Sequence, residues 1–166
     1  MKILVPIDGS PLSLAALRHA IALVREGLRA ELVLANVQPP ANLYEWMRSP
    51  DPDALGHIAE AAGQHALETA ESLLRDAGLD ATELLVTGDP AHALIELIES
   101  EGCDAVIMGS HGTSGLLSAF QGSVSQAMLH SSPVPVTLVK PAEPTETEAE
   151  EETTAEADEE GEATGA

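Results

Sequence analysis

The segment MGSHGTSGLLSAFQGSVSQ, residues 108–126, decides the fold of this chain. It begins at the end of a short apolar run, residues 105–108, which is typical of a strand buried on both faces of a parallel sheet. Three glycines follow at a spacing of three: Gly109, Gly112 and Gly115. Nine residues then separate Gly112 from Gly122, where a helical pattern begins. The segment therefore predicts a strand, a glycine-rich loop and a helix in succession.

This succession predicts an anion-binding site. Glycine permits positive φ and allows the backbone to approach a ligand closely. A helix that begins at Gly122 directs its first N–H groups and the positive end of its dipole into the same space. Such an arrangement suits phosphate, with the hydroxyls of Ser123 and Ser125 as further donors. The alternative is a glycine-rich turn between strand and helix that binds nothing.

Length and composition indicate one domain with an aliphatic core. The chain has 166 residues, of which 44% are hydrophobic and only 2% aromatic. Runs rich in Val and Ile alternate with helical patterns, which favours the α/β class. The expected strands are residues 2–8, 31–37, 80–87, 105–108 and 133–140. The expected helices are residues 11–28, 54–77, 90–101 and 122–130.

Alternating strands and helices predict parallel pairing with right-handed crossovers. Ligands of such sheets bind beyond the carboxyl ends of the strands, where the strand order reverses. Two segments lie at such ends, Pro6–Asp8 and Met108–Gly109. Pro6 suits the end of its strand because proline has no N–H for the ladder. Ser10 and Asp89, each followed by proline, are predicted as helix N-caps.

The formal net charge of −21 is unevenly distributed. Residues 141–166 hold eleven acidic and no basic residues, and we expect this tail to be disordered because it contains no large apolar residue. Residues 1–140 hold 17 acidic and 7 basic residues, a net −10. Neither part offers the basic surface that nucleic acids or anionic membranes require, so neither partner is expected.

The glycine spacing resembles the nucleotide-binding signature of the universal stress protein family. The pattern Gly-x2-Gly-x9-Gly-Ser is matched at every fixed position: Gly109, Gly112, Gly122 and Ser123. It is neither a P-loop nor the Gly-x-Gly-x-x-Gly of dinucleotide folds. The resemblance covers residues 1–140 and implies an α/β three-layer sandwich of the adenine nucleotide alpha hydrolase-like type. Its five-stranded parallel sheet would have the order 3-2-1-4-5.

The resemblance also implies an ATP-binding stress protein with a defined set of contacts. Pro6 and Asp8 would meet adenine and ribose, Val37 would line the base pocket and Met108 would flank it. The remaining contacts, to ribose and phosphates, would come from Gly109, Gly112, Gly122, Ser123, Val124 and Ser125. For Asp8 the alternative role is an Asx turn at the start of the first helix.

The expected cofactor is ATP with Mg²⁺, with ADP or AMP as alternatives. Many similar proteins carry Lys or Arg where this chain has Thr113, and no Lys or Arg occurs from Met108 to Leu129. A divalent cation would then offset the phosphate charge, and Mg²⁺ prefers phosphate oxygens and water to a full protein cage. No site for a metal held by the protein alone is predicted, because His57 and His65 are too isolated.

No catalytic residue is predicted. The chain has neither a Gly-x-Ser-x-Gly elbow nor a His-Glu-x-x-His motif, and His111 is expected to face solvent. A regulatory module is therefore favoured over a metabolic enzyme, with a slow ATPase and a non-binding dimeric interaction module as alternatives. The resemblance implies a homodimer formed through the last strand, residues 133–140. Cytoplasmic location is expected, because Cys103 is the sole cysteine and Met1–Lys2 leads directly into a strand.

Overall fold

The computed structural model of the chain describes residues 1–39, 52–111 and 122–141, with residues 52–59 described by their backbone alone. Five strands form one parallel sheet in the order β3-β2-β1-β4-β5. They are β1 (Lys2–Pro6), β2 (Glu31–Gln38), β3 (Ala81–Thr87), β4 (Ala105–Gly109) and β5 (Val136–Val139). The helices in these ranges are α1 (Pro11–Arg25), α3 (Pro52–Ala77), α4 (Pro90–Glu101) and α5 (Ser123–Ser131).

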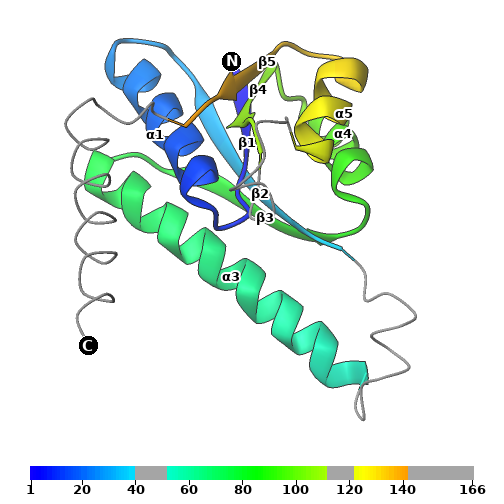
Figure 1. The fold of residues 1–166 in the computed structure, drawn as a ribbon. Coiled ribbons are helices and arrows are strands. Elements are labelled where there is room, and N and C mark those ends of the chain that lie inside the picture. The colour runs from blue at the N-terminus through cyan, green and yellow to red at the C-terminus, as the bar shows by residue number, and fades with distance from the viewer. Residues whose placement is uncertain (40–51, 112–121, 142–166) are drawn as a thin grey trace, which may run out of the picture.

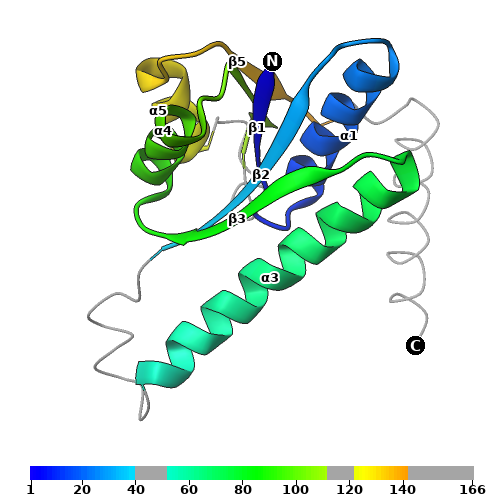
Figure 2. The same cartoon turned by 180° about the vertical axis from the view of Figure 1, so that it is seen from behind.

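Helices cover both faces of the sheet, so the predicted three-layer architecture and strand order are confirmed (Figure 1). Helices α1 and α3 lie on one face, and α4 and α5 lie on the other, as the reverse view also shows (Figure 2). Alternate residues of the central strand supply the two cores. Ile3 and Val5 pack with α1 and α3, whereas Leu4 packs with α4 and α5. Among the described residues, both buried clusters consist mainly of aliphatic side chains.

The predicted helix caps are present. The Ser10 hydroxyl accepts the N–H of Ser13 at 3.1 Å, and the Asp89 carboxylate accepts the N–H of His92 at 3.1 Å. Helix α4 ends at Gly102, which has the left-handed φ of 65° that glycine adopts without strain. Both capped helices begin at the carboxyl edge of the sheet.

Two predicted strands are longer than the observed ones by more than one residue, and proline is the reason in both. Strand β1 ends at Pro6 rather than Asp8, as expected for proline at the end of a ladder. Strand β5 begins at Val136 rather than at Pro133, because neither Pro133 nor Pro135 has an N–H to donate. The last strand therefore comprises four residues at the edge of the sheet.

Pro6 also opens the sheet where its strand order reverses. The N–H of Ile7 donates to Ala35 of β2 at 2.8 Å. Successive residues of a strand turn their N–H groups to opposite neighbours, so Pro6 presents its missing N–H to β4. The register between β1 and β4 accordingly covers only Ile3 and Leu4. Beyond Leu4 no further pairs between β1 and β4 are formed, at the place where ligands bind in such sheets.

Some predictions concern residues outside the described ranges. The predicted disordered tail lies there from residue 142 onward. Among the helices in the described ranges, none combines the length and the apolarity that crossing a membrane requires.

Candidate functional site

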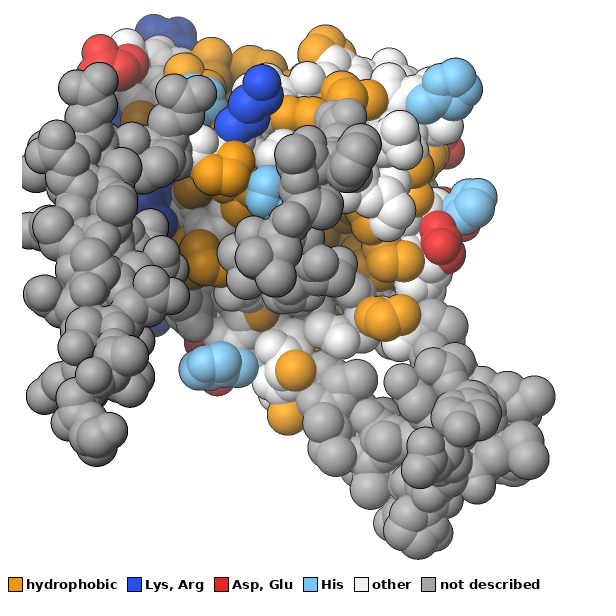
Figure 3. Space-filling view, viewed as in Figure 1, with side chains coloured by type: hydrophobic (Ala, Val, Ile, Leu, Met, Phe, Trp, Pro, Cys, Tyr) orange, Lys and Arg blue, Asp and Glu red, His pale blue; other side chains and the backbone are white. Residues whose placement is uncertain are grey.

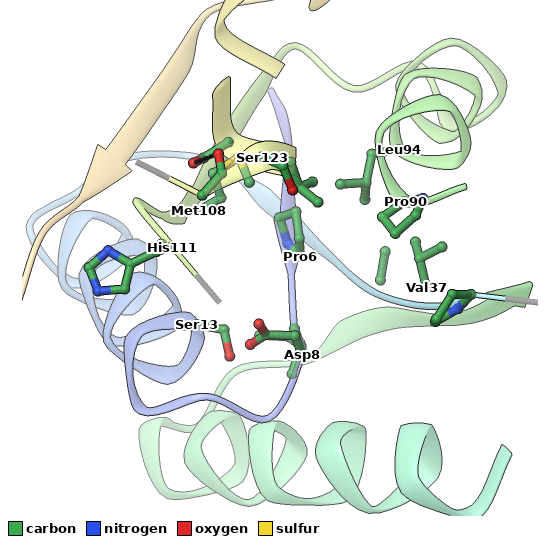
Figure 4. A pocket seen from close by; sticks show the side chains of 16 residues that line it. Pro6, Asp8, Ser13, Val37, Pro90, Leu94, Met108, His111 and Ser123 are labelled. Carbon is green, nitrogen blue, oxygen red and sulfur yellow. Dashed lines mark hydrogen bonds between the residues drawn. The ribbon is translucent and has the colours of Figure 1, made fainter. Parts of the chain in front are cut away.

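A cavity of about 370 Å³ lies at the carboxyl ends of β1 and β4, between the first turns of α1, α4 and α5 (Figure 4). The structure brings nine of the ten predicted site residues together around it. These are Pro6, Asp8, Val37, Met108, Gly109, Gly122, Ser123, Val124 and Ser125. The tenth, Gly112, lies outside the described residues. The lining residues that the sequence did not single out as site residues are Ile7, Ser13, Ala35, Pro39, Pro90, Leu94 and His111.

One wall of the cavity is apolar. Val37, Pro90 and Leu94 lie together on the side away from His111 (Figure 4). Leu94 is buried, so this wall is backed by the core rather than by loop residues. The signal for Pro90 was present in the sequence, because a helix that follows strand β3 must also begin at the carboxyl edge of the sheet.

Asp8 is exposed and lines the cavity just beyond the carboxyl end of β1. Its carboxylate accepts the N–H of Ser10 at 2.9 Å, which is the Asx turn considered as the alternative role. The two roles are compatible. The turn fixes the carboxylate, which points toward Ser13 at the margin of the cavity (Figure 4).

Two glycines of the motif are needed for contacts within the protein. A Cβ added at Gly109 would lie 3.0 Å from Cγ of Leu12, and one at Gly122 would lie 3.0 Å from Cα of His111. Neither glycine has positive φ, so of the two properties that glycine offers, positive φ and close approach, only close approach is used at these positions. Both glycines allow a close approach of two backbone segments: Gly109 lies against the start of α1, and Gly122 lies against His111.

The carbonyl of Ser110 holds the two ends of the glycine-rich loop together. It accepts the N–H of Gly122 at 2.9 Å and the hydroxyl of Ser125 at 2.6 Å. A serine hydroxyl has one hydrogen to donate, and that of Ser125 is directed at carbonyls of the protein. The expectation that Ser125 donates its hydroxyl to phosphate is therefore not supported, whereas Ser123 is exposed at the cavity.

Helix α5 begins without a side-chain cap, because its N-cap residue is Gly122. The N–H groups of the first turn of an α-helix have no partner within the helix. Here Ser123, Val124 and Ser125 form that turn, and all three line the cavity. The positive end of the helix dipole and these N–H groups make this wall favourable for an anion.

His111 lines the cavity and is half-buried, so the expectation that it faces solvent is only partly correct. Its Nδ1 lies 3.1 Å from the hydroxyl oxygen of Ser110, a contact between sequence neighbours that was not anticipated. His111 is also the one described lining residue whose side chain can carry a positive charge.

The charge of the lining is otherwise unfavourable to phosphate. The described lining residues include the carboxylate of Asp8 and neither Lys nor Arg. The face of the molecule seen in Figure 3 displays many hydrophobic side chains and few Lys or Arg side chains. Within residues 1–39, 60–111 and 122–141, no cluster of three or more His, Cys, Asp or Glu side chains is placed to hold a metal ion.

Asp89 contributes a second negative charge near the cavity, beside Pro90. Its pKa is held below the ordinary value by the hydrogen bond from the His92 N–H, and further by the His92 ring. The ring Nδ1 lies 2.8 Å from the carboxylate. Asp89 is thus ionised at neutral pH and occupies the start of α4 as a cap.

Comparison with known proteins connects this geometry to a family. The family model described as "Universal stress protein family" matches residues 1–140. The universal stress protein YxiE of Bacillus subtilis is 32% identical, over 84% of this chain and 98% of that protein.

Solved structures extend the similarity to three dimensions. MJ0577 of Methanocaldococcus jannaschii superposes with a TM-score of 0.73 at 28% identity, over 86% of this chain and 96% of its own. A universal stress protein in complex with cAMP has a TM-score of 0.63 at 28% identity, over 84% of this chain and 96% of its own.

Proposed function

Because the chain belongs to the universal stress protein family, we propose that it binds an adenine nucleotide and acts as a nucleotide-responsive regulatory module. The observation that carries this proposal is the cavity at the carboxyl ends of β1 and β4, into which the uncapped first turn of α5 faces. The relative whose structure is described as a complex with cAMP supports an adenine nucleotide as the ligand class.

The proposed ligand uses the two kinds of wall differently. The base occupies the apolar side, near Val37, Leu94 and Met108, and Asp8 accepts from an amino group or a ribose hydroxyl. Phosphate lies against the first turn of α5, with Ser123 as a side-chain donor. The volume of about 370 Å³ falls at the small end of the usual range for ligand pockets, roughly 300–1,000 Å³.

We propose Mg²⁺ as the companion of a di- or triphosphate. The N–H groups and the dipole of an exposed helix end contribute only about 0.3–1 kcal/mol to the binding of a charge. Asp8 opposes a polyphosphate, and no described lining residue is Lys or Arg. A cation carried by the nucleotide offsets that charge without needing a protein-built cage. ADP and AMP remain in the proposed ligand class.

The test begins with the purified protein, which is denatured and its released small molecules separated by nucleotide chromatography. Calorimetry then measures the Kd of AMP and of ATP, the latter with and without Mg²⁺. Val37→Phe fills the apolar side and should abolish binding, whereas Val37→Ala, which enlarges it, should retain binding. Gly122 is unsuitable as the control because its substitution disturbs the contact with His111. No co-purified nucleotide and no heat at millimolar nucleotide would refute the proposal.

The unfavourable charge of the lining supports one rival, a dimeric interaction module of this fold that binds no nucleotide. The same calorimetry decides between the two. A slow ATPase is the other rival. It would require turnover that persists through purification and disappears in a Ser123 variant.

The proposed assembly is a homodimer formed through β5. This strand lies at the edge of the sheet, and its Val136, Leu138 and Val139 are half-buried. Leu129 of the adjacent α5 is 50% exposed. An edge strand with apolar side chains is favourable for pairing with a second copy. A monomer mass by light scattering at micromolar concentration would contradict the dimer.

We propose a cytoplasmic location for the protein, where the buried Cys103 thiol stays reduced.

A further inference from the structure

Asn36 is a buried polar side chain near the carboxyl end of the apolar strand β2. It is 2% exposed, and its neighbours on the same face of the strand, Leu32 and Leu34, belong to the core beneath α1 and α3. Burying an amide is unfavourable unless its hydrogen-bonding groups find partners. Asn36 has a partner for each: Nδ2 donates to the carbonyl of Ile7 at 2.7 Å, and Oδ1 accepts from Nε2 of Gln38 at 2.7 Å.

These bonds fix the backbone that leads into Asp8. Ile7 donates its N–H to Ala35 at 2.8 Å and accepts the side chain of Asn36 at its carbonyl, so both of its backbone polar groups are held from β2. The peptide between Ile7 and Asp8 is planar, so holding the carbonyl of Ile7 also sets the direction of the Asp8 N–H. Asp8 then closes the Asx turn with Ser10.

Helix α3 packs on the side-chain amide of Asn36 at Gly63. A Cβ added at Gly63 would lie 2.6 Å from Oδ1 of Asn36 and 3.1 Å from Nε2 of Gln38. A side chain at Gly63 would therefore displace the amide of Asn36. Gln38 is also tied to the α4 side of the cavity, because its carbonyl accepts the N–H of Gly88 at 3.0 Å. The segments at the ends of β1, β2 and β3 are thus connected through residues of β2.

We propose that Asn36 is a positioning residue of the nucleotide site. Its side chain is absent from the lining and belongs to the α3 face of the sheet. Through the carbonyl of Ile7 it orients the Asp8 carboxylate at the margin of the cavity. This inference rests on the proposed function for its effect on binding, but its effect on the backbone at Asp8 holds with or without a ligand.

The first experiment compares Asn36→Leu with Val33→Ala. Leucine has nearly the shape of asparagine but cannot donate a hydrogen bond to the carbonyl of Ile7. Val33 is fully buried on the opposite face of the same strand, and its side chain forms no hydrogen bonds. At a temperature where both variants are folded, Asn36→Leu should weaken binding of AMP and of MgATP by about tenfold. Val33→Ala should bind both as the wild type does. Equal weakening in the two variants would overturn the proposal, because it would reflect lost stability alone.

A double-mutant cycle tests whether Asn36 acts through Asp8. In the Asp8→Ala background the further change Asn36→Leu should have little effect on the Kd, since the group that it positions is gone. Fully additive losses would contradict the proposed route. Gln38→Leu, which removes the partner of Oδ1 at a half-buried position, should weaken binding in the same direction by less. It provides a second variant if Asn36→Leu does not fold.

The second experiment needs no nucleotide. Hydrogen exchange of the Asp8 and Ser10 amides, followed by NMR in the ligand-free protein, should be faster in Asn36→Leu and unchanged in Val33→Ala. If the wild type binds neither AMP nor MgATP, the proposed function fails while this measurement still decides the positioning role. Unchanged exchange at both amides in Asn36→Leu and in Gln38→Leu would refute it.

Discussion

Helices α4 and α5 both begin at the carboxyl edge of the sheet, border the same cavity and pack against each other, yet they begin differently. The N-cap of α4 is Asp89, whose carboxylate accepts the N–H of His92 and places a negative charge on the helix end. The N-cap of α5 is Gly122, which has no side chain with which to cap. A side chain of the protein thus accepts an N–H of the first turn of α4, whereas no side chain caps the first turn of α5.

The difference follows from packing rather than from any property of the ligand. At Gly122 the backbone of His111 is so close that a Cβ would lie 3.0 Å from its Cα. A capping side chain at this position would therefore crowd His111, whereas Asp89 is exposed to solvent. Because Gly122 is needed for this close approach, the positive end of the α5 dipole has no capping side chain at the cavity. This difference is the reason for proposing α5 rather than α4 as the phosphate site.

The largest expected effect is that of Gly122→Ala. The added methyl group meets the backbone of His111, which cannot move aside as a flexible side chain could. Overpacking of this kind costs about 1–3 kcal/mol of unfolding free energy, which urea denaturation would measure. Ser123→Ala, one residue further along at an exposed position, should leave the unfolding free energy nearly unchanged. Equal stability of Gly122→Ala and wild type would remove the steric explanation for the missing cap.

A second prediction separates phosphate from base. If phosphate lies against α5, Ser123→Ala should raise the Kd of AMP by about fivefold to tenfold, because a hydrogen bond to a charged group is lost. The same variant should bind adenosine as the wild type does. Ser100→Ala, on the exposed side of α4, is the matched control and should change neither Kd. Weaker adenosine binding in Ser123→Ala would place this residue against the nucleoside instead.

The contrast between the two helix starts also separates what the sequence could predict from what it could not. Capping is a local interaction, so Ser-Pro and Asp-Pro at residues 10–11 and 89–90 were sufficient to locate two helix starts. Alternating strands and helices gave parallel pairing, while the strand order came from a family resemblance. Close approach is different, since the neighbours of Gly109 and Gly122 belong to segments that only the folded chain brings near.

The same limit applies to residues whose importance depends on distant partners. Asn36 has no sequence signal, because its partner Ile7 is 29 residues away and the local pattern is an ordinary apolar strand. Ser125 fits the motif, but the direction of its hydroxyl depends on the carbonyl of Ser110, 15 residues away. The sequence thus located most residues that line the cavity, and the structure shows which of their polar groups bond within the protein.

A third prediction concerns the capped helix. Asp89→Ala removes the acceptor for the His92 N–H and should lower the Tm, by less than Gly122→Ala does. Affinity for AMP should stay within about twofold of the wild type, a difference of less than 0.5 kcal/mol, because α4 is not the proposed phosphate site. Asp80→Ala removes a charge of the same sign at an exposed position and serves as the control. Tighter AMP binding in Asp89→Ala alone would indicate that phosphate lies nearer to α4.

A fourth prediction uses pH to isolate the same cap. The pKa of Asp89 is lowered in the folded protein by the His92 N–H, so its carboxylate contributes stability above the unfolded-state pKa. That contribution is lost as pH falls through the lower folded-state pKa. Asn is also a good N-cap but does not titrate, so Asp89→Asn should lose less stability than the wild type below about pH 4. Parallel Tm profiles down to pH 2 would contradict a lowered pKa.

The smallest expected effect is that of Glu83→Gln on β3, and it sharpens the acid titration of Asp89. The pKa of Glu83 is raised, first by partial burial and then by the nearby Glu71 carboxylate. A raised folded-state pKa contributes stability at acid pH that is lost as pH rises through it, which is opposite in sign to Asp89. At neutral pH Glu83→Gln should therefore raise the Tm slightly, whereas Glu99→Gln, at an exposed position of α4, should not.

In the Glu83→Gln background the loss of stability at acid pH that is assigned to Asp89 should become steeper, because the opposing titration of Glu83 is gone. A lower Tm at pH 7 in Glu83→Gln would mean that the ionised carboxylate is stabilised by a neighbour, and the background would then be unsuitable for reading the helix cap.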